Sequence, residues 1–118
     1  MGNRALITVV TVSWYSSMFI ENLLENLTCK ARNIDKILFY VIDNSNGNDA
    51  SLSALKNKYE NIIIEEFDVQ SLTGSWAHAF GLNYATNRIC TPYTLIIDPD
   101  VYLFKNDWDD FFVDEIEF

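Results

Sequence analysis

Residues 6–12 read LITVVTV, a run of apolar and β-branched residues without a charge. Such a run is typical of a strand that is covered on both faces, as in a parallel sheet between helices. Three further stretches have the same character: Ile37–Ile42 (ILFYVI), Ile62–Ile64 and Tyr93–Ile97 (YTLII). The sequence therefore predicts four buried strands.

The segments between these strands have helical spacing. Their predicted apolar positions are Phe19, Leu23, Leu24 and Leu27 in the first segment, and Leu52, Leu55 and Tyr59 in the second. The third helix is expected from about Trp76 to Arg88. Residues suited to cap the three helices are Ser16 or Ser17, Asp49 and Ser75.

The alternation of strands and helices predicts an α/β fold, with a Rossmann-like parallel sheet between two helical layers. At 118 residues the chain is expected to form a single domain over residues 1–118. With 49% hydrophobic residues it has enough apolar surface for a core. No leader and no membrane span are visible, and Cys29 and Cys90 are interpreted as ordinary thiols, so the cytoplasm is the expected compartment.

The net charge of −9 comes mostly from six acidic residues after Lys105. They are Asp107, Asp109, Asp110, Asp114, Glu115 and Glu117. A nucleic-acid-binding domain shows clustered Lys and Arg instead, so nucleic acid is not an expected partner. We interpret the acidic stretch as a solvated helix face rather than a functional site.

Ligands of open parallel sheets bind at the carboxyl ends of the strands, so the residues just after each strand are the candidates for a site. These residues are Ser13-Trp14-Tyr15, Asp43-Asn44-Ser45, the loop from Asp68 to Gly74, and Asp98-Pro99-Asp100. They are largely polar or aromatic, which indicates a functional edge.

Asp98-Pro99-Asp100 is the sharpest of these features. Two carboxylates two residues apart can bind one hard cation, and Mg²⁺ or Mn²⁺ would keep positions open for phosphate oxygens. The structural alternative is a plain turn, since Asp and Pro both favour turns. Its position after a buried strand favours the metal site.

The other candidates also have structural alternatives. Asp43 can accept a hydrogen bond from the ring N–H of a uracil or thymine, or it can form an Asx-turn. Trp14 can stack on a base, whereas Tyr15 is expected to pack in a lid or the core. His78 alone is more often structural than catalytic, and Gly74 can be a loop glycine or can let backbone N–H groups approach phosphate.

With strands and acids in place, the chain resembles family 2 glycosyltransferases of the GT-A fold. The matching stretches are residues 8–27 (TVVTVSWYSSMFIENLLENL), 37–51 (ILFYVIDNSNGNDAS) and 73–111. The last stretch is the most specific, because it holds Gly74, His78, Leu82-Asn83, Asp98-Pro99-Asp100 and Trp108-Asp109 in the family's order. Leu72 and Ala79 depart from the family pattern.

The resemblance implies a strand order of 3-2-1-4, truncated after the strand bearing the D-x-D motif, because the family's acceptor-binding half and catalytic aspartate lie beyond that motif and this sequence stops at Phe118. It implies transfer of a sugar from a nucleoside diphosphate donor to an acceptor hydroxyl, with a divalent cation, Mg²⁺ or Mn²⁺, helping the diphosphate to leave. Ser13 and Asp43 would hold the base, Asp98 would contact ribose and the metal's water shell, and Asp100 the metal. The acceptor (glycan, lipid or protein) and the catalytic base are not assigned.

Two other functions are compatible with parts of the sequence pattern. A non-catalytic module for nucleotide binding or oligomerisation would keep the same half-fold, and an exposed sheet edge at the fourth strand predicts a homo-oligomer. A phosphatase of the haloacid-dehalogenase type is disfavoured, because its aspartate motif should follow the first strand and not the fourth. Dinucleotide and P-loop glycine motifs do not occur in the sequence.

Overall fold

The sheet of this protein is parallel throughout, as the sequence predicts. A computed structural model describes residues 4–68 and 74–117. Its four strands are β1 (Ile7–Ser13), β2 (Ile37–Asp43), β3 (Ile62–Glu66) and β4 (Tyr93–Ile96), in the order β3-β2-β1-β4. This order confirms the predicted 3-2-1-4 arrangement.

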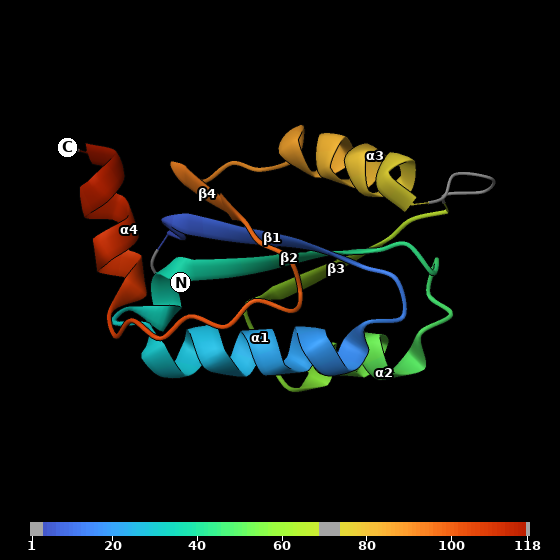
Figure 1. Cartoon of the computed structure of the whole chain (residues 1–118), viewed down its shortest axis with the longest axis horizontal. Coiled ribbons are helices and arrows are strands. Elements are labelled where there is room, and N and C mark those ends of the chain that lie inside the picture. Colours follow the sequence, from blue (N-terminus) through green and yellow to red (C-terminus); the bar gives the residue numbers. More distant parts are fainter. Residues whose placement is uncertain (1–3, 69–73, 118) are drawn as a thin grey trace.

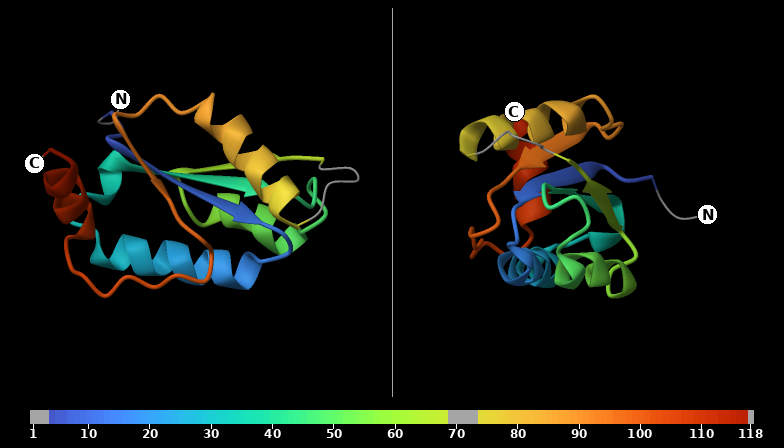
Figure 2. Two further views of the ribbon diagram at one scale, coloured as in Figure 1. Left: turned by 45° about the horizontal axis from the view of Figure 1, so that its top comes forward. Right: turned by 90° about the vertical axis from the view of Figure 1, so that its right-hand side faces the viewer.

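Helices cover both faces of the sheet (Figures 1 and 2). On one face lie α1 (Ser17–Lys30), α2 (Ala50–Ser53) and the 3-10 turn that follows it, Ala54–Asn57. On the other face lies α3 (Gly74–Thr86), and α4 (Trp108–Glu117) stands across the amino-terminal end of the strands. The three-layer prediction is confirmed, and among the described residues no helix is long and apolar enough to cross a bilayer.

Alternation along the strands divides the core between the two faces. The larger cluster joins odd-numbered residues of β1, such as Ile7 and Val9, to the apolar face of α1. The smaller cluster joins Val10 and Val12 to Ile42 and to α3. Cover on both faces thus explains the all-apolar runs of β1 and β2. The prediction that all four strands are buried is wrong for β3 and β4, where residues such as Ile63 and Ile96 are exposed.

Helix α1 buries Ile20, Leu23, Leu24 and Leu27, whereas Phe19 is exposed. The prediction that Phe19 belongs to the apolar face is therefore wrong. Residues 19 and 20 both fit a period of 3.6 residues with the leucines, so spacing alone does not separate them. Ser16 is at the N-cap position of α1, but its hydroxyl donates to the Trp14 carbonyl and makes no cap hydrogen bond.

The second helix begins at its predicted cap, whereas the third differs from its predicted limits. Asp49 caps α2 as expected, accepting a hydrogen bond from the Leu52 N–H at 3.3 Å. Helix α3 begins at Gly74, so Ser75 lies inside its first turn rather than at the cap, and it ends at Thr86 instead of Arg88. Gly81 lets α3 approach β2, because a Cβ atom there would meet Ile42 Cγ2 at 2.9 Å.

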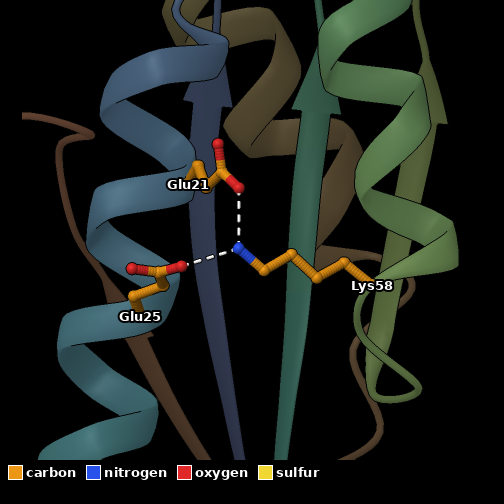
Figure 3. A network of polar contacts seen from close by, with 3 residues as sticks. All are labelled: Glu21, Glu25 and Lys58. Carbon is orange, nitrogen blue, oxygen red and sulfur yellow. Dashed lines mark hydrogen bonds and ion pairs between the residues drawn. The ribbon is translucent and has the colours of Figure 1, made fainter.

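A surface ion-pair network links α1 to the segment before β3 (Figure 3). Lys58 Nζ lies 2.8 Å from Glu21 Oε2 and 2.6 Å from Glu25 Oε1. Glu21 and Glu25 are four residues apart on one face of α1, which lets one ammonium group contact both. Hydrogen bonds to the two carboxylates raise the pKa of Lys58 above its ordinary value.

A buried phenol joins β2 to β3. Tyr40 Oη donates to Glu65 Oε1 at 2.9 Å. Burial, and next the bond to Glu65, raise the pKa of Tyr40 to about 12, and the Glu65 charge adds to this. The pKa of Tyr40 in the folded state exceeds its ordinary value of 10. The contribution of this phenol to the free energy of unfolding is therefore complete below pH 10 and is lost only as the pH rises toward 12.

Candidate nucleotide and metal site

The turns that follow β1 and β2 lie at the same end of the molecule as the start of α3 (Figure 1). In Figure 1 the turns after β1 and β2 and the start of α3 all lie at the right-hand end. The sequence predictions for Trp14, Asp43 and Gly74 therefore fall on the same edge of the sheet.

The turn after β1 presents an aromatic pair to solvent. Ser13 is fully buried, and its Oγ accepts the Ser16 N–H at 3.2 Å, which closes the turn. Trp14 is 62% exposed, and its ring meets the Tyr15 ring edge-on at 4.9 Å. Ser13 thus holds a turn in which both aromatic side chains, Trp14 and Tyr15, are exposed to solvent.

Tyr15 is exposed, so of the two expected roles, packing in a lid or in the core, the core role is wrong. Its φ of 54° lies in the left-handed region, which is rare for a bulky residue. Backbone strain of this kind costs about 1–3 kcal/mol and is concentrated at binding and active sites. The strained turn is a signal that sequence patterns do not reveal.

The Asp43 carboxylate shapes the loop after β2. Oδ1 accepts from the Ser45 N–H at 2.9 Å and from the Ser45 hydroxyl at 2.6 Å, and Oδ2 accepts from the Gly47 N–H at 3.1 Å. The Asp43 side chain is fully buried. These bonds correspond to the Asx-turn alternative, and they fix the backbone of the loop at the predicted base site.

The same loop is tied to α2 and to β3. The Ser45 Oγ accepts the Asp49 N–H at 3.0 Å. Gly47 has a φ of 85°, and a Cβ atom there would lie 2.8 Å from the Glu66 carboxyl carbon. The positive φ favours glycine at 47, whereas the nearby Glu66 carboxylate ends a flexible, exposed side chain that can move aside.

Asp98-Pro99-Asp100 forms a tight turn at the end of β4. The Ile97 N–H donates to the Val10 carbonyl at 3.0 Å, and the Val101 N–H donates to the Asp98 carbonyl at 3.3 Å. Pro99 is thus the second residue of a four-residue turn, where its fixed φ is favoured. Both aspartates are exposed, so the turn directs two carboxylates toward solvent.

Strand β4 is shorter than β1 at this edge. Ile96, its last residue, pairs with Val10, whereas β1 continues to Ser13. The D-x-D turn therefore lies beside the last residues of β1 and not beyond them. A ligand that reaches from Trp14 to Asp100 would follow the end of β1.

Helix α3 reaches the same edge through Asn44. The Asn44 Nδ2 donates to the Ala77 carbonyl at 3.5 Å, a long bond, and the Asn44 Oδ1 is buried without a partner within the described residues. Gly74 is the first residue of α3, and His78 follows it by four residues, partly exposed. The loop between Asp68 and Gly74, including Leu72, lies outside the described residues.

The donor set fits a cation that is shared with a ligand. Among residues 4–68 and 74–117, three or more His, Cys, Asp or Glu side chains do not come together as a metal cage. Asp98 and Asp100 supply two carboxylates, which suits Mg²⁺ or Mn²⁺ completed by water and phosphate oxygens. A cation would neutralise a diphosphate beside these carboxylates.

The segment after the D-x-D turn returns along α1 to the other end of the sheet (Figure 2). The buried Asn26 side chain of α1 pairs with Leu103: Nδ2 donates to the Leu103 carbonyl at 2.9 Å, and Oδ1 accepts its N–H at 2.8 Å. Further on, Trp108 Nε1 donates to the Leu27 carbonyl at 2.8 Å. α1 thus holds this segment at two places.

Asp109 corrects the prediction of a wholly solvated acidic face. It is buried, and its two carboxylate oxygens each accept a backbone N–H, from Arg32 and from Asn33, at 2.9 Å. Asp110 lies 3.4 Å from Arg32 Nε, and both side chains of this pair are well exposed. Trp108-Asp109 is therefore a structural pair that joins α4 to the end of α1.

Two hollows lie at the opposite, amino-terminal end of the strands. One, of about 80 Å³, is lined by α4 and the starts of β1 and β2, and is too small for a nucleotide. The other, of about 610 Å³, is an open depression whose lining includes Arg4, Lys36 and Cys90. We place the site at the carboxyl edge instead, where ligands of open parallel sheets bind.

Comparisons with known proteins bear on the fold. The sequence matches no family model and no curated protein. The structure resembles the mannosyltransferase PcManGT from Pyrobaculum calidifontis, solved with GDP-Man and Mn²⁺, with a TM-score of 0.65 and 19% identity over 89% of this chain. It also resembles residues 1–349 of S. aureus TarS, with a TM-score of 0.69 and 20% identity over 93%.

The chain covers 30% of the PcManGT chain and 32% of the TarS chain. Structures of TarS with UDP and with UDP-GlcNAc show the same likeness, with TM-scores of 0.68 and 0.66. Identities near 20% establish the fold alone. The chain therefore has the fold of the GT-A glycosyltransferases, over a length of about a third of these solved structures or less.

Proposed function

We propose that this chain is the donor-binding portion of a metal-dependent glycosyltransferase that takes a nucleoside diphosphate sugar. The observation that carries the proposal is the D-x-D turn, which directs Asp98 and Asp100 to solvent beside the end of β1. The similar structures add weight, because PcManGT was solved with GDP-Man and Mn²⁺, and TarS with UDP-GlcNAc.

In this proposal the base lies against the exposed face of Trp14, and the turn closed by Ser13 holds that ring in place. Asp43 acts through the loop that its carboxylate organises, since its side chain is fully buried. Asp98 and Asp100 would hold the cation, which offsets the charge of the diphosphate. Gly74 and His78, at the start of α3, would face the sugar diphosphate.

The proposal extends to the cellular compartment and the catalytic activity of this chain. Both cysteines are exposed free thiols, which suits a reducing compartment, and we propose the cytoplasm. We assign no catalytic base and no acceptor to this chain, so by itself it is expected to bind the donor and to turn over little.

Calorimetric titration tests the donor site. UDP, GDP and TDP would each be titrated into the protein with Mn²⁺ and then with a chelator in its place. At least one nucleotide is expected to bind with Mn²⁺ and to lose about tenfold or more in affinity without it, a difference of about 1.4 kcal/mol. Binding of none of the three in the presence of Mn²⁺ contradicts the proposal.

A second proposal concerns self-association through β4, an edge strand of the described sheet. Large apolar side chains are exposed on β4 and just after the D-x-D turn: Ile96, Tyr102 and Phe104. Such an edge favours pairing with another copy. The alternative function, a non-catalytic oligomerisation module, would depend on this surface and not on Asp98 or Asp100.

Sedimentation velocity over a range of concentrations tests the edge. The protein is expected to dimerise or assemble further, and Ile96→Lys to sediment as a monomer, because a charge on an edge strand opposes pairing. Ile116→Lys, on the exposed side of α4, is the matched control and should assemble like the original. A monomer at every concentration, or unchanged assembly of Ile96→Lys, would rule the interface out.

A further inference from the structure

Short hydrogen bonds hold the backbone of the D-x-D turn at its two ends, and a longer one holds it in the middle. At its start, the Ile97 N–H bonds to the Val10 carbonyl at 3.0 Å. At its end, Leu103 has both backbone groups bonded to the Asn26 amide, at 2.8 and 2.9 Å. Inside the turn, the Val101 N–H reaches the Asp98 carbonyl at a longer 3.3 Å. The shape of residues 98–102 therefore depends on the two end points.

Asn26 is an unusual residue for its position. It is 5% exposed on the face of α1 that otherwise buries Leu23, Leu24 and Leu27. A buried amide is costly unless both its oxygen and its nitrogen have partners. The Leu103 N–H donates to the Asn26 Oδ1, and the Leu103 carbonyl accepts from the Asn26 Nδ2. The amide therefore bonds both backbone groups of Leu103, as a neighbouring strand would in a sheet.

We propose that Asn26 is a positioning residue for the metal-binding turn. This inference rests on the proposed donor site, and it adds a residue of α1 that touches neither cation nor nucleotide. Ordering a backbone segment costs conformational entropy, so a turn released at one end would have to be ordered each time it binds a cation, which weakens binding. With Leu103 fixed beforehand, Asp98 and Asp100 are held in place before the ligand arrives.

The test compares Asn26→Ala with two controls. Asn22→Ala removes an exposed amide one turn earlier on α1. Leu55→Ala removes a buried core side chain from the 3-10 turn after α2, so it lowers stability without removing a hydrogen bond to Leu103. All proteins would be measured at a temperature where circular dichroism shows them folded.

Two measurements are needed. Amide hydrogen exchange in residues 98–104 is expected to quicken in Asn26→Ala and to stay unchanged in both controls. In titrations of UDP with Mn²⁺, Asn26→Ala should lose about tenfold in affinity, as is common when a residue that orients metal ligands is removed. Its affinity for UDP without metal should equal that of the original protein.

The outcomes separate the two proposals. If the original protein shows no Mn²⁺-dependent binding of UDP, GDP or TDP, the donor site itself fails, and this inference fails with it. If the original binds and Asn26→Ala binds equally well, the donor site stands and the positioning role is wrong. An equal loss in Leu55→Ala would also overturn the role, because it would trace the effect to stability alone.

Discussion

Asp100→Asn is expected to abolish Mn²⁺-dependent nucleotide binding while leaving the fold intact. The residue is exposed on a turn, so its replacement removes a charge without opening the core. In the proposed site, the cation loses a direct ligand and half of the negative charge that the protein supplies to it. We expect affinity in Mn²⁺ to fall about 100-fold or more, about 2.7 kcal/mol, for Asp100→Asn, and less for Asp98→Asn.

Two measurements would report this loss: the affinity from calorimetry, and the rise in melting temperature on addition of Mn²⁺ with nucleotide. Asp114→Asn, an exposed aspartate on α4, is the matched control for the change in net charge. If Asp100→Asn binds nucleotide in Mn²⁺ as tightly as the original protein, Asp98-Pro99-Asp100 is a structural turn and not a metal site.

Trp108→Ala is expected to have the largest effect on stability. The ring is 3% exposed, belongs to the larger core cluster, and donates to the Leu27 carbonyl at 2.8 Å. Removing a buried aromatic ring costs about 3–5 kcal/mol, and the carbonyl also loses its partner. A domain of this length is stable by about 6–18 kcal/mol, so much of the margin would be lost.

Urea denaturation measures the loss. Trp108→Phe keeps most of the ring and removes the indole N–H, so it separates the hydrogen bond from packing and should cost about 1–3 kcal/mol. Trp76→Ala is the control: that ring is 75% exposed, and a change within about 0.5 kcal/mol is expected. Equal losses in Trp108→Ala and Trp76→Ala would contradict the structural role.

The fold was predictable because its signals are local. Runs such as LITVVTV fix the strands, and right-handed crossovers leave few arrangements for them. Boundaries were less certain, because residues such as Phe19 and Ile20 satisfy the same helical period. Which of them is buried depends on how α1 docks on the sheet, and that is a tertiary property.

The candidate site could be predicted from the sequence only in part. The place of Asp98 and Asp100 after a strand predicts cation ligands, and the place of Trp14 after β1 predicts a base-stacking residue; both roles stay predictions. Asn26 could not be predicted, because a polar residue in a helix is usually taken for a surface residue, and its partner is 77 positions away. Asp109 was missed for the same reason, being one of several acids in a charged stretch. Tyr15 is revealed only by its backbone angle.

The bonds between α1 and the returning segment set a lower limit on the useful size of this unit. A piece that stopped at Asp100 would keep the whole D-x-D motif. It would lose the bonds that Asn26, Leu27, Arg32 and Asn33 make with residues 103–109. The D-x-D residues and the contacts that hold their turn are thus separable in sequence, and we expect that a fragment meant to bind the proposed donor has to extend through Asp109.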